Sequence, residues 1–344
     1  MQQSPKKTNG CLWLFVFALF CFAGVLILAA FLSIHWALAF IASGIVSVLL
    51  ANKIAGKPTV GSLFKNVGFL FLLIIGLRFF LLFLIEFVTI PSAEETTFNV
   101  EEGVAKSIII EGTDSVSVYS SNRIWKDNYG NNYEGKLTVR EKDFLRLHHH
   151  INSYKVTSSP NFWGNLYDYI DRTDTPSLDL VMTTFEEIHS RKNLNQMEFA
   201  EMVISCIQDI PYAFVFQEEC LPAQNYEESI RLVLENCPEC CIGHVKYGIQ
   251  NPVSFLQNLK GDCDTRTVLI YAILKHFNYD VAILNSEFYR HSIIGLNLPA
   301  KGLYKNYYGK KYVVWETTAK YYTAGQLPYN FNDITHWNVV LTSK

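Results

Sequence analysis

Three long, nearly uncharged runs near the N-terminus constrain this chain more than any other feature. Residues 12–32 contain no charged side chain, and a helix of roughly 20 residues spans the ~30 Å hydrocarbon core of a bilayer. Similar runs cover residues 34–51 and 67–90, and only the last contains an arginine, Arg78. The runs predict a membrane domain, residues 1–91, with three transmembrane helices.

The positions of the lysines predict how such a domain would be oriented. Lys6 and Lys7 precede the first run, which is also typical of a cleaved signal peptide, but a second apolar run follows at once and favours retained helices. The positive-inside rule places the N-terminus in the cytoplasm and residues 91–344 on the other side. We therefore expect an integral membrane protein in contact with the lipid bilayer. Arg78 would pair with other helices or snorkel.

Composition and local patterns divide the remainder of the chain. A formal net charge of -3 shows no basic excess that would indicate nucleic-acid binding. Residues 92–160 contain short β-favouring pieces such as SVSVY and KLTVR, which predict a β-rich accessory region. The run His148–His150 fits a polar surface strand better than a metal site, because neighbouring strand residues point to opposite faces. Residues 161–212 form a helical lead-in, in which Asn195 and Glu198 predict a capping box.

The stretch GDCDTRTVLIYAIL places Cys263 where an apolar run begins. Asp262 is a suitable N-cap, and a helix that is apolar on all sides should be central and buried. At the start of this helix the Cys263 sulfur would lie in the positive field of the helix dipole, which favours the thiolate. The alternative is that Cys263 is a small buried core residue, as free cysteines often are.

Three β-patterned pieces follow the cysteine helix, and two of them carry side chains with suitable chemistry. HSIIGLNL begins with His291, and KYVVWETT contains Glu316. A helix followed by a small antiparallel sheet is an α+β pattern. Cysteine acyl transfer needs a thiolate, an imidazole and an acceptor that fixes the imidazole tautomer. Cys263, His291 and Glu316 could supply these three roles in that order.

The sequence around these residues resembles the transglutaminase-like superfamily. The resemblance rests on GDCDTRTVLIYAIL, HSIIG and WETT, and on QDIPY and NPVSFLQNLKGDC before them, within residues 195–330. It implies a papain-like core, with the catalytic core at 251–330 of a domain covering 161–344. Glu316 departs from the superfamily, where this position is more often aspartate. Helix-start amides, Gln208 and Tyr212 are candidates for stabilising the oxyanion.

These patterns predict a membrane-anchored cysteine hydrolase or acyl transferase that attacks protein or peptide amides through a thioester. Water as the acceptor would make it a peptidase or amidase, and an amine would make it a transglutaminase. The alternative is a catalytically silent binding or scaffold module. No cofactor is expected, and the oligomeric state is left open.

A cysteine-rich insert, residues 213–250, lies before the catalytic core. In an oxidising compartment four of its cysteines are expected to form disulfides. The competing interpretation is a metal site in CPECCIGH, which also includes His244. Adjacent cysteines rarely bind one ion together, so no metal is expected. The four cysteines are Cys220, Cys237, Cys240 and Cys241.

Overall fold

The computed structural model describes residues 10–31, 36–57, 61, 78, 103–156 and 160–344. The chain forms two units, Met1–Ser92 and Ala93–Lys344, which are described separately below.

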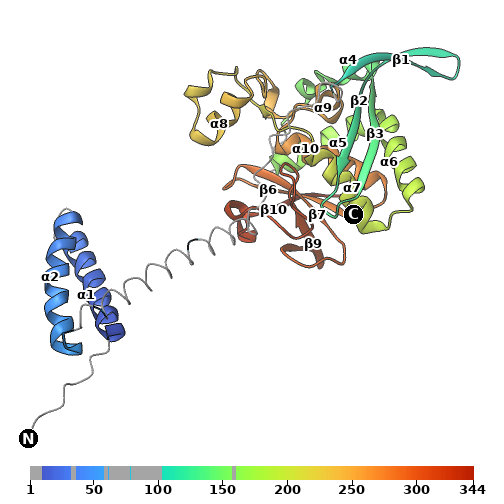
Figure 1. Ribbon diagram of the computed structural model, residues 1–344. Coiled ribbons are helices and arrows are strands. Elements are labelled where there is room, and N and C mark those ends of the chain that lie inside the picture. Colours follow the sequence, from blue (N-terminus) through green and yellow to red (C-terminus); the bar gives the residue numbers. More distant parts are fainter. Residues whose placement is uncertain (1–9, 32–35, 58–60, 62–77, 79–102, 157–159) are drawn as a thin grey trace, which may run out of the picture. The chain divides into compact units, whose positions relative to one another are not determined.

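The first unit contains a pair of helices, α1 (Gly10–Phe31) and α2 (Trp36–Ala55), which lie side by side (Figure 1). Trp13 of α1 and Ala51 of α2 belong to one small apolar cluster. The Trp13 indole N–H donates a hydrogen bond of 2.9 Å to Asn52 Oδ1. Part of the apolar and polar surface of the two helices is therefore used in packing them against each other.

The prediction of transmembrane helices is wrong for the described residues. The predicted spans 12–32 and 34–51 fall on α1 and α2, but no helix in the described part of the chain is long and apolar enough to cross a membrane. The predicted third span, 67–90, lies outside the described residues except for Arg78.

Several further expectations depended on those spans. An integral membrane location, a cytoplasmic N-terminus, an extracytoplasmic position for residues 91–344 and contact with a lipid bilayer were all inferred from them. All of these lose their basis with the finding on helix length and apolarity.

The second unit is an α+β structure with two antiparallel sheets and helices between and around them (Figure 1). The smaller sheet has the order β1-β2-β3, and the larger has the order β10-β6-β7-β9-β8. The strands are β1 (Ala105–Glu111), β2 (Asp114–Lys126), β3 (Asn132–Arg140), β6 (Val281–Ser286), β7 (His291–Leu296), β8 (Tyr304–Tyr307), β9 (Lys310–Trp315) and β10 (Asn338–Thr342). The helices are α4 (Glu141–Leu147), α5 (Phe162–Asp174), α6 (Asp179–Lys192), α7 (Gln196–Gln208), α8 (Glu228–Asn236), α9 (Pro252–Asn258) and α10 (Cys263–His276).

The smaller sheet shares one hydrophobic core with the helices. Trp125 of β2 and Leu137 of β3 belong to the same buried cluster as Phe185 of α6 and Ile204 of α7. The Trp125 indole N–H donates to the backbone oxygen of Met202, at 3.1 Å, on α7. Residues on either side of position 160 therefore fold around a single core.

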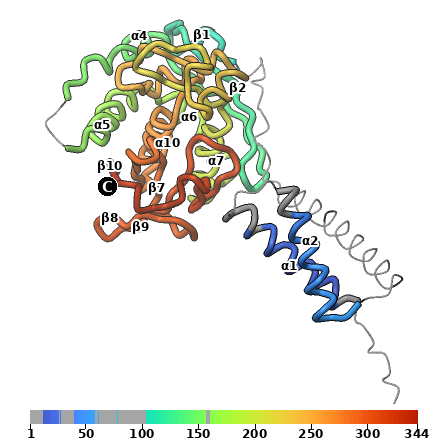
Figure 2. The backbone as a smooth tube through the Cα atoms, turned by 90° about the vertical axis from the view of Figure 1, so that its left-hand side faces the viewer, coloured from blue at the N-terminus to red at the C-terminus, as the bar shows by residue number. Residues whose placement is uncertain are grey.

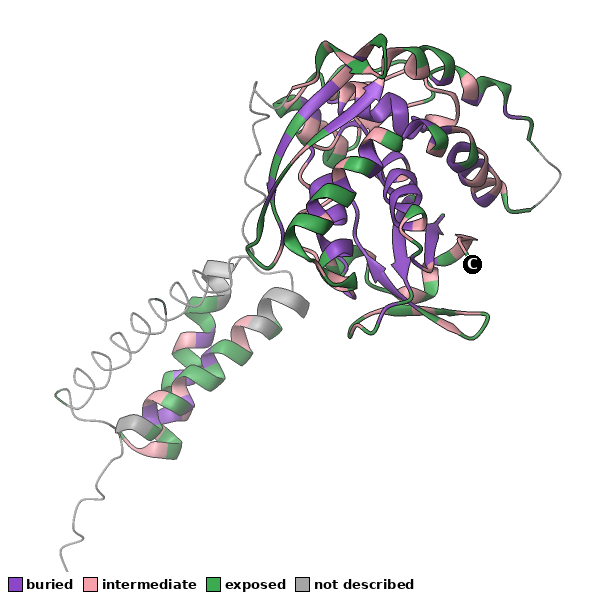
Figure 3. Ribbon diagram, turned by 90° about the vertical axis from the view of Figure 1, so that its right-hand side faces the viewer, coloured by how far each residue is buried: buried purple, intermediate pink, exposed green. Residues whose placement is uncertain are grey.

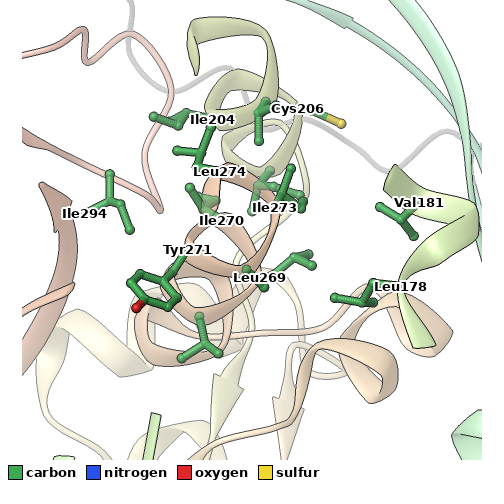
Figure 4. Close-up of a cluster of buried hydrophobic side chains, with 14 of the residues drawn as sticks. Leu178, Val181, Ile204, Cys206, Leu269, Ile270, Tyr271, Ile273, Leu274 and Ile294 are labelled. Carbon is green, nitrogen blue, oxygen red and sulfur yellow. The ribbon is translucent and has the colours of Figure 1, made fainter. Parts of the chain in front are cut away.

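Helix α10 occupies the centre of this unit, as predicted (Figure 2). Its residues from Val268 to Leu274 are all buried and contact side chains from α6, α7 and β7 (Figure 4). Asp262 is the N-cap, with its carboxylate accepting from Thr265 N at 3.1 Å. Burial of large apolar side chains on every face of one helix stabilises the fold by roughly 1.5–3 kcal/mol for each.

The central strands of the larger sheet, β6 and β7, are buried on both faces. Every residue of β6 and β7 is buried (Figure 3). One face packs on α10, and the other packs on a second cluster that includes Leu327 and Trp337. The strands bring the first residue of β7 close to the residue after β9, because Ile294 pairs with Trp315.

Other elements test the remaining local predictions. The capping box of Asn195 and Glu198 is confirmed, with both reciprocal bonds present. Helix α5 lies within the predicted helical lead-in, residues 161–212. The run His148–His150 does not form a strand: it follows α4 and enters a short 3-10 helix, His150–Ser153. Two short strands, β4 (Phe214–Val215) and β5 (Cys241–Ile242), pair in parallel in the cysteine-rich insert.

Candidate functional site

Cys263 is the first residue of α10 and is 6% exposed. The chain reaches it through Gly261, where a Cβ atom would lie 2.8 Å from the Phe255 ring and 2.9 Å from Thr265 Cγ2. Contacts that short are not tolerated, so the tight approach to the helix requires glycine at this position. The sequence thus fixes the sulfur at the N-terminal end of a buried helix.

His291 and Glu316 lie next to each other at the end of the larger sheet. His291 Nε2 is 3.2 Å from Glu316 Oε2 and 3.3 Å from Oε1. Glu316 Oε1 also accepts bonds from Thr317 N at 3.0 Å, Thr318 N at 2.8 Å and Thr318 Oγ1 at 2.6 Å. These three donors fix the carboxylate, which in turn orients the imidazole.

The other side of the imidazole faces the thiol. Cys263 and His291 lie close enough for each side chain to shift the pKa of the other. Because Nε2 is used by Glu316, Nδ1 is the ring nitrogen left for the sulfur. The imidazole ring also stacks on Phe331, with centroids 5.0 Å apart and planes at 22°. The three side chains therefore form a connected Cys–His–Glu series with the imidazole in the middle.

Burial and neighbouring charges set the proton affinities in this series. Burial raises the pKa of the Cys263 thiol, and the nearby Asp264 carboxylate raises it further. Together they outweigh the lowering effect of His291 and leave this pKa above its ordinary value. This direction is opposite to the one expected from the helix dipole alone. Burial lowers the pKa of His291, but Cys263 and Glu316 outweigh burial and hold it well above its ordinary value. Burial likewise raises the pKa of Glu316, and His291 and Thr318 outweigh burial to leave it lowered.

Asp264 brings a second carboxylate to the thiol. Its Oδ1 accepts a bond of 2.6 Å from the Tyr167 hydroxyl, and the same hydroxyl accepts from Asn285 Nδ2 at 3.1 Å. Ser292, the neighbour of His291, also bonds to Asp264. The carboxylate is thus held beside Cys263 by side chains from α5 and the larger sheet.

Replacing Asp264 with Asn is expected to move the alkylation of Cys263 to lower pH. Removing the carboxylate charge removes the second largest of the three causes that raise the pKa of this thiol, which are burial, Asp264 and, least of all, Asp262, and Asn can still accept from Tyr167. The check is the rate of iodoacetamide alkylation of Cys263 against pH, followed by mass spectrometry. Asp262→Asn is the control, because it preserves the N-cap and should shift the midpoint less. An unchanged or higher midpoint in Asp264→Asn would contradict this expectation.

The two oxyanion candidates have different surroundings. Gln208 Nε2 donates to the backbone oxygens of Glu316, at 2.7 Å, and Tyr322, at 3.4 Å. Both amide hydrogens are thereby used, and the geometry assigns Gln208 the role of holding the Glu316 backbone. Tyr212 lies beside the site: burial, and next the nearby Cys263, raise the pKa of its phenol. Tyr212 and the backbone amide of Cys263 are the oxyanion donors that this geometry favours.

Arg266 was not singled out from the sequence. It lies one turn after Cys263, is fully buried, and donates to the backbone oxygens of Gly261, Ile207, Ile210 and Pro211 over 2.6–2.9 Å. These bonds tie the cysteine helix to the end of α7 and to the segment that carries Tyr212. The signal that could have found it is an arginine directly before the apolar run TVLIYAIL, on a helix expected to be buried.

The four cysteines of the insert are paired in two disulfides, Cys220–Cys241 and Cys237–Cys240. All three sulfurs that the metal interpretation of CPECCIGH requires are therefore in disulfides, two with each other and that of Cys241 with Cys220. Cys206 and Cys263 form no disulfide. The nucleophile candidate remains a thiol, separate from the oxidised cysteines of the insert.

Comparisons with known proteins identified no relative of this chain. No family model matches the chain, and neither the curated proteins nor the solved structures include a match.

Proposed function

We propose that the chain is a cysteine hydrolase or acyl transferase of the transglutaminase-like type, acting on protein or peptide amides. The observation that carries the proposal is the position of the His291 imidazole, next to the Cys263 thiol and hydrogen-bonded to the Glu316 carboxylate. Each of the three residues alone has an ordinary structural explanation. Their connection in this order is what acyl transfer by cysteine requires.

The proposed reaction follows from these contacts. His291 takes the thiol proton as the Cys263 sulfur attacks the amide carbonyl, and the negative charge develops on the carbonyl oxygen near Tyr212 and the helix-start amides. The imidazolium then protonates the departing amine, which leaves a thioester on Cys263. Water or an incoming amine attacks the thioester and gives its proton to His291, and the imidazolium then gives that proton to the departing Cys263 sulfur, which restores the thiol.

A second candidate function is a silent module that holds a peptide without reacting. It is favoured by the low exposure of Cys263, at 6%, and by the upward direction of its thiol pKa. Both features reduce the thiolate available for attack.

Mass spectrometry of one reaction mixture tests the proposal. The full chain is incubated with a glutamine-containing peptide and a primary amine, and the products report cleavage, deamidation or amine incorporation. We expect at least one of these with the parent chain, none with Cys263→Ala, and full activity with Cys206→Ala, which removes a buried cysteine of α7 outside the triad. Product formation that survives Cys263→Ala would disprove the mechanism. A parent chain that forms no product while binding the peptide would favour the silent module.

A further inference from the structure

A row of aromatic side chains begins beside the reactive cysteine. Tyr212, Phe214 and Phe216 alternate along an extended segment, so their side chains lie on one face. Their rings touch in sequence, with centroids 5.2 Å apart for the first pair and 5.7 Å for the second. Tyr226 stacks on Phe216 at 5.2 Å and 13°. All four, called the aromatic row below, are partly exposed.

Contacts at both ends connect the aromatic row to the site. Ala213 N donates to the backbone oxygen of Gly261, at 3.3 Å, two residues before Cys263. At the other end, Glu227 follows Tyr226 and forms an ion pair of 3.6 Å with Arg290, the residue before His291. At ~3.3 Å per residue the extended part of the row covers the length of about four residues of an extended peptide.

The insert that carries the aromatic row is strongly acidic. Between residues 213 and 250 there are six glutamates, one arginine and one lysine. The six glutamates are all exposed. Glu218 and Glu219 come shortly after Phe216, and Glu227 and Glu228 come directly after Tyr226. A field of one sign around an exposed apolar face selects partners of the opposite charge.

Aromatic rings and negative charge together favour one kind of ligand. Lysine and arginine are attracted to the faces of aromatic rings and to carboxylates, and their long aliphatic stems cover apolar surface. An acidic peptide would be repelled by the same glutamates. Packing within the insert explains why the rings contact one another. It does not explain why the rings stay partly exposed and are surrounded in sequence by exposed glutamates.

We propose that the aromatic row and its glutamates bind a basic, extended segment of the protein substrate and thereby present a neighbouring amide to Cys263. The inference rests on the proposed function and specifies its substrate class. The cationic side chains lie over the rings, and the backbone of the segment follows the row toward the reactive sulfur.

Binding to the unreactive full chain tests this inference independently of turnover. Cys263→Ala is titrated against two fluorescein-labelled peptides that differ only in carrying lysine or glutamate at the same positions. Fluorescence anisotropy is expected to give a Kd at least about tenfold lower for the lysine peptide, with the difference shrinking as salt is raised because exposed charges are screened.

Two variants in the same background locate the binding. The triple change Glu218→Gln, Glu219→Gln and Glu228→Gln should weaken binding of the lysine peptide, while Glu186→Gln with Glu187→Gln, exposed glutamates of α6, should not. Phe216→Leu keeps an apolar side chain but removes the aromatic face, and should also weaken binding.

Each other outcome overturns either the inference or the proposed function. Equal binding of the two peptides, or equal loss in the α6 control, would remove the charge argument. A change in sedimentation of the variants without peptide binding would identify the row as a contact between copies of this chain. If the lysine peptide does not bind while the parent chain still forms products that require Cys263, the inference fails and the proposed function stands. If it binds and no product forms, the proposed function fails and the row remains a peptide site.

Discussion

Glu316→Gln is expected to preserve the fold and to lower kcat/KM by roughly 10³–10⁴-fold, the loss seen when a triad carboxylate becomes an amide. The three donors from Thr317 and Thr318 converge on Oε1, so the glutamine oxygen will take that position. Its NH₂ group then faces His291 Nε2. A donor at this place requires Nε2 to be an acceptor, and the neutral ring must then carry its proton on Nδ1.

That tautomer explains the size of the expected loss. With its proton on Nδ1, the imidazole donates toward Cys263 and is unable to accept the thiol proton. Removal of the carboxylate charge also lowers the pKa of His291, because Glu316 is one of the two groups that raise it. The limb of the pH profile that belongs to the imidazolium should therefore move to lower pH.

The measurement pairs product formation with the pH dependence of Cys263 alkylation. Glu316→Asp is the matched control: it keeps the charge but moves it one methylene away, so it should fall between the parent and Glu316→Gln. A Glu316→Gln variant with parental rates and an unmoved imidazolium limb would show that Glu316 does not orient the imidazole.

The sequence predicted the elements of the site well because each has a local cause. Asp262 before an apolar run signals an N-cap, and the alternation and bounds of HSIIG and KYVVW signal strands that bring His291 and Glu316 to one end of a sheet. The bounds of helix α5 within the helical lead-in were not predicted, because FWGNLYDYI is rich in aromatic residues that favour strands. Its helical state depends on packing against α10 and β10.

The electrostatics of the site could not be obtained from local sequence. The helix-dipole argument favoured the Cys263 thiolate, yet the sulfur is buried and lies beside Asp264. How far a side chain is buried depends on α5 and the larger sheet, which are far away along the chain. Hydropathy correctly predicted apolar helices at α1 and α2. The further prediction that these helices span a membrane rested on apolar composition alone and is wrong for the described residues.

The largest loss of stability is expected from Arg266→Leu. The buried Arg266 guanidinium donates to four backbone oxygens, and a leucine side chain has no donor to replace it. Gly261 O and Ile207 O keep backbone partners, from Ala213 N and Ile210 N respectively, so the change chiefly strands the oxygens of Ile210 and Pro211. Loss of charge-assisted bonds to buried acceptors costs about 3–5 kcal/mol in total when no partner replaces them.

The free energy of unfolding of the full chain, from urea titration followed by tryptophan fluorescence, measures this loss. The buried Trp125, Trp315 and Trp337 report on the second unit. Arg172→Leu is the control, because Arg172 is an exposed arginine paired with Asp168 on α5, and such pairs contribute about 1 kcal/mol or less. Arg266→Lys should lie between the two: it keeps a positive charge, but an ammonium has three donors and lacks the planar fork that reaches four oxygens.

The ordering of these three variants separates charge from geometry. Burial lowers the pKa of Arg266 to about 10, so the side chain is still cationic at neutral pH. Its hydrogen bonds among the described residues all go to backbone carbonyl oxygens. If Arg266→Lys is as stable as the parent, charge is sufficient and the fork is dispensable. If Arg266→Leu loses no more than Arg172→Leu, the Ile210 and Pro211 oxygens have found other donors, and Arg266 does not fix the segment that leads from α7 to the aromatic row.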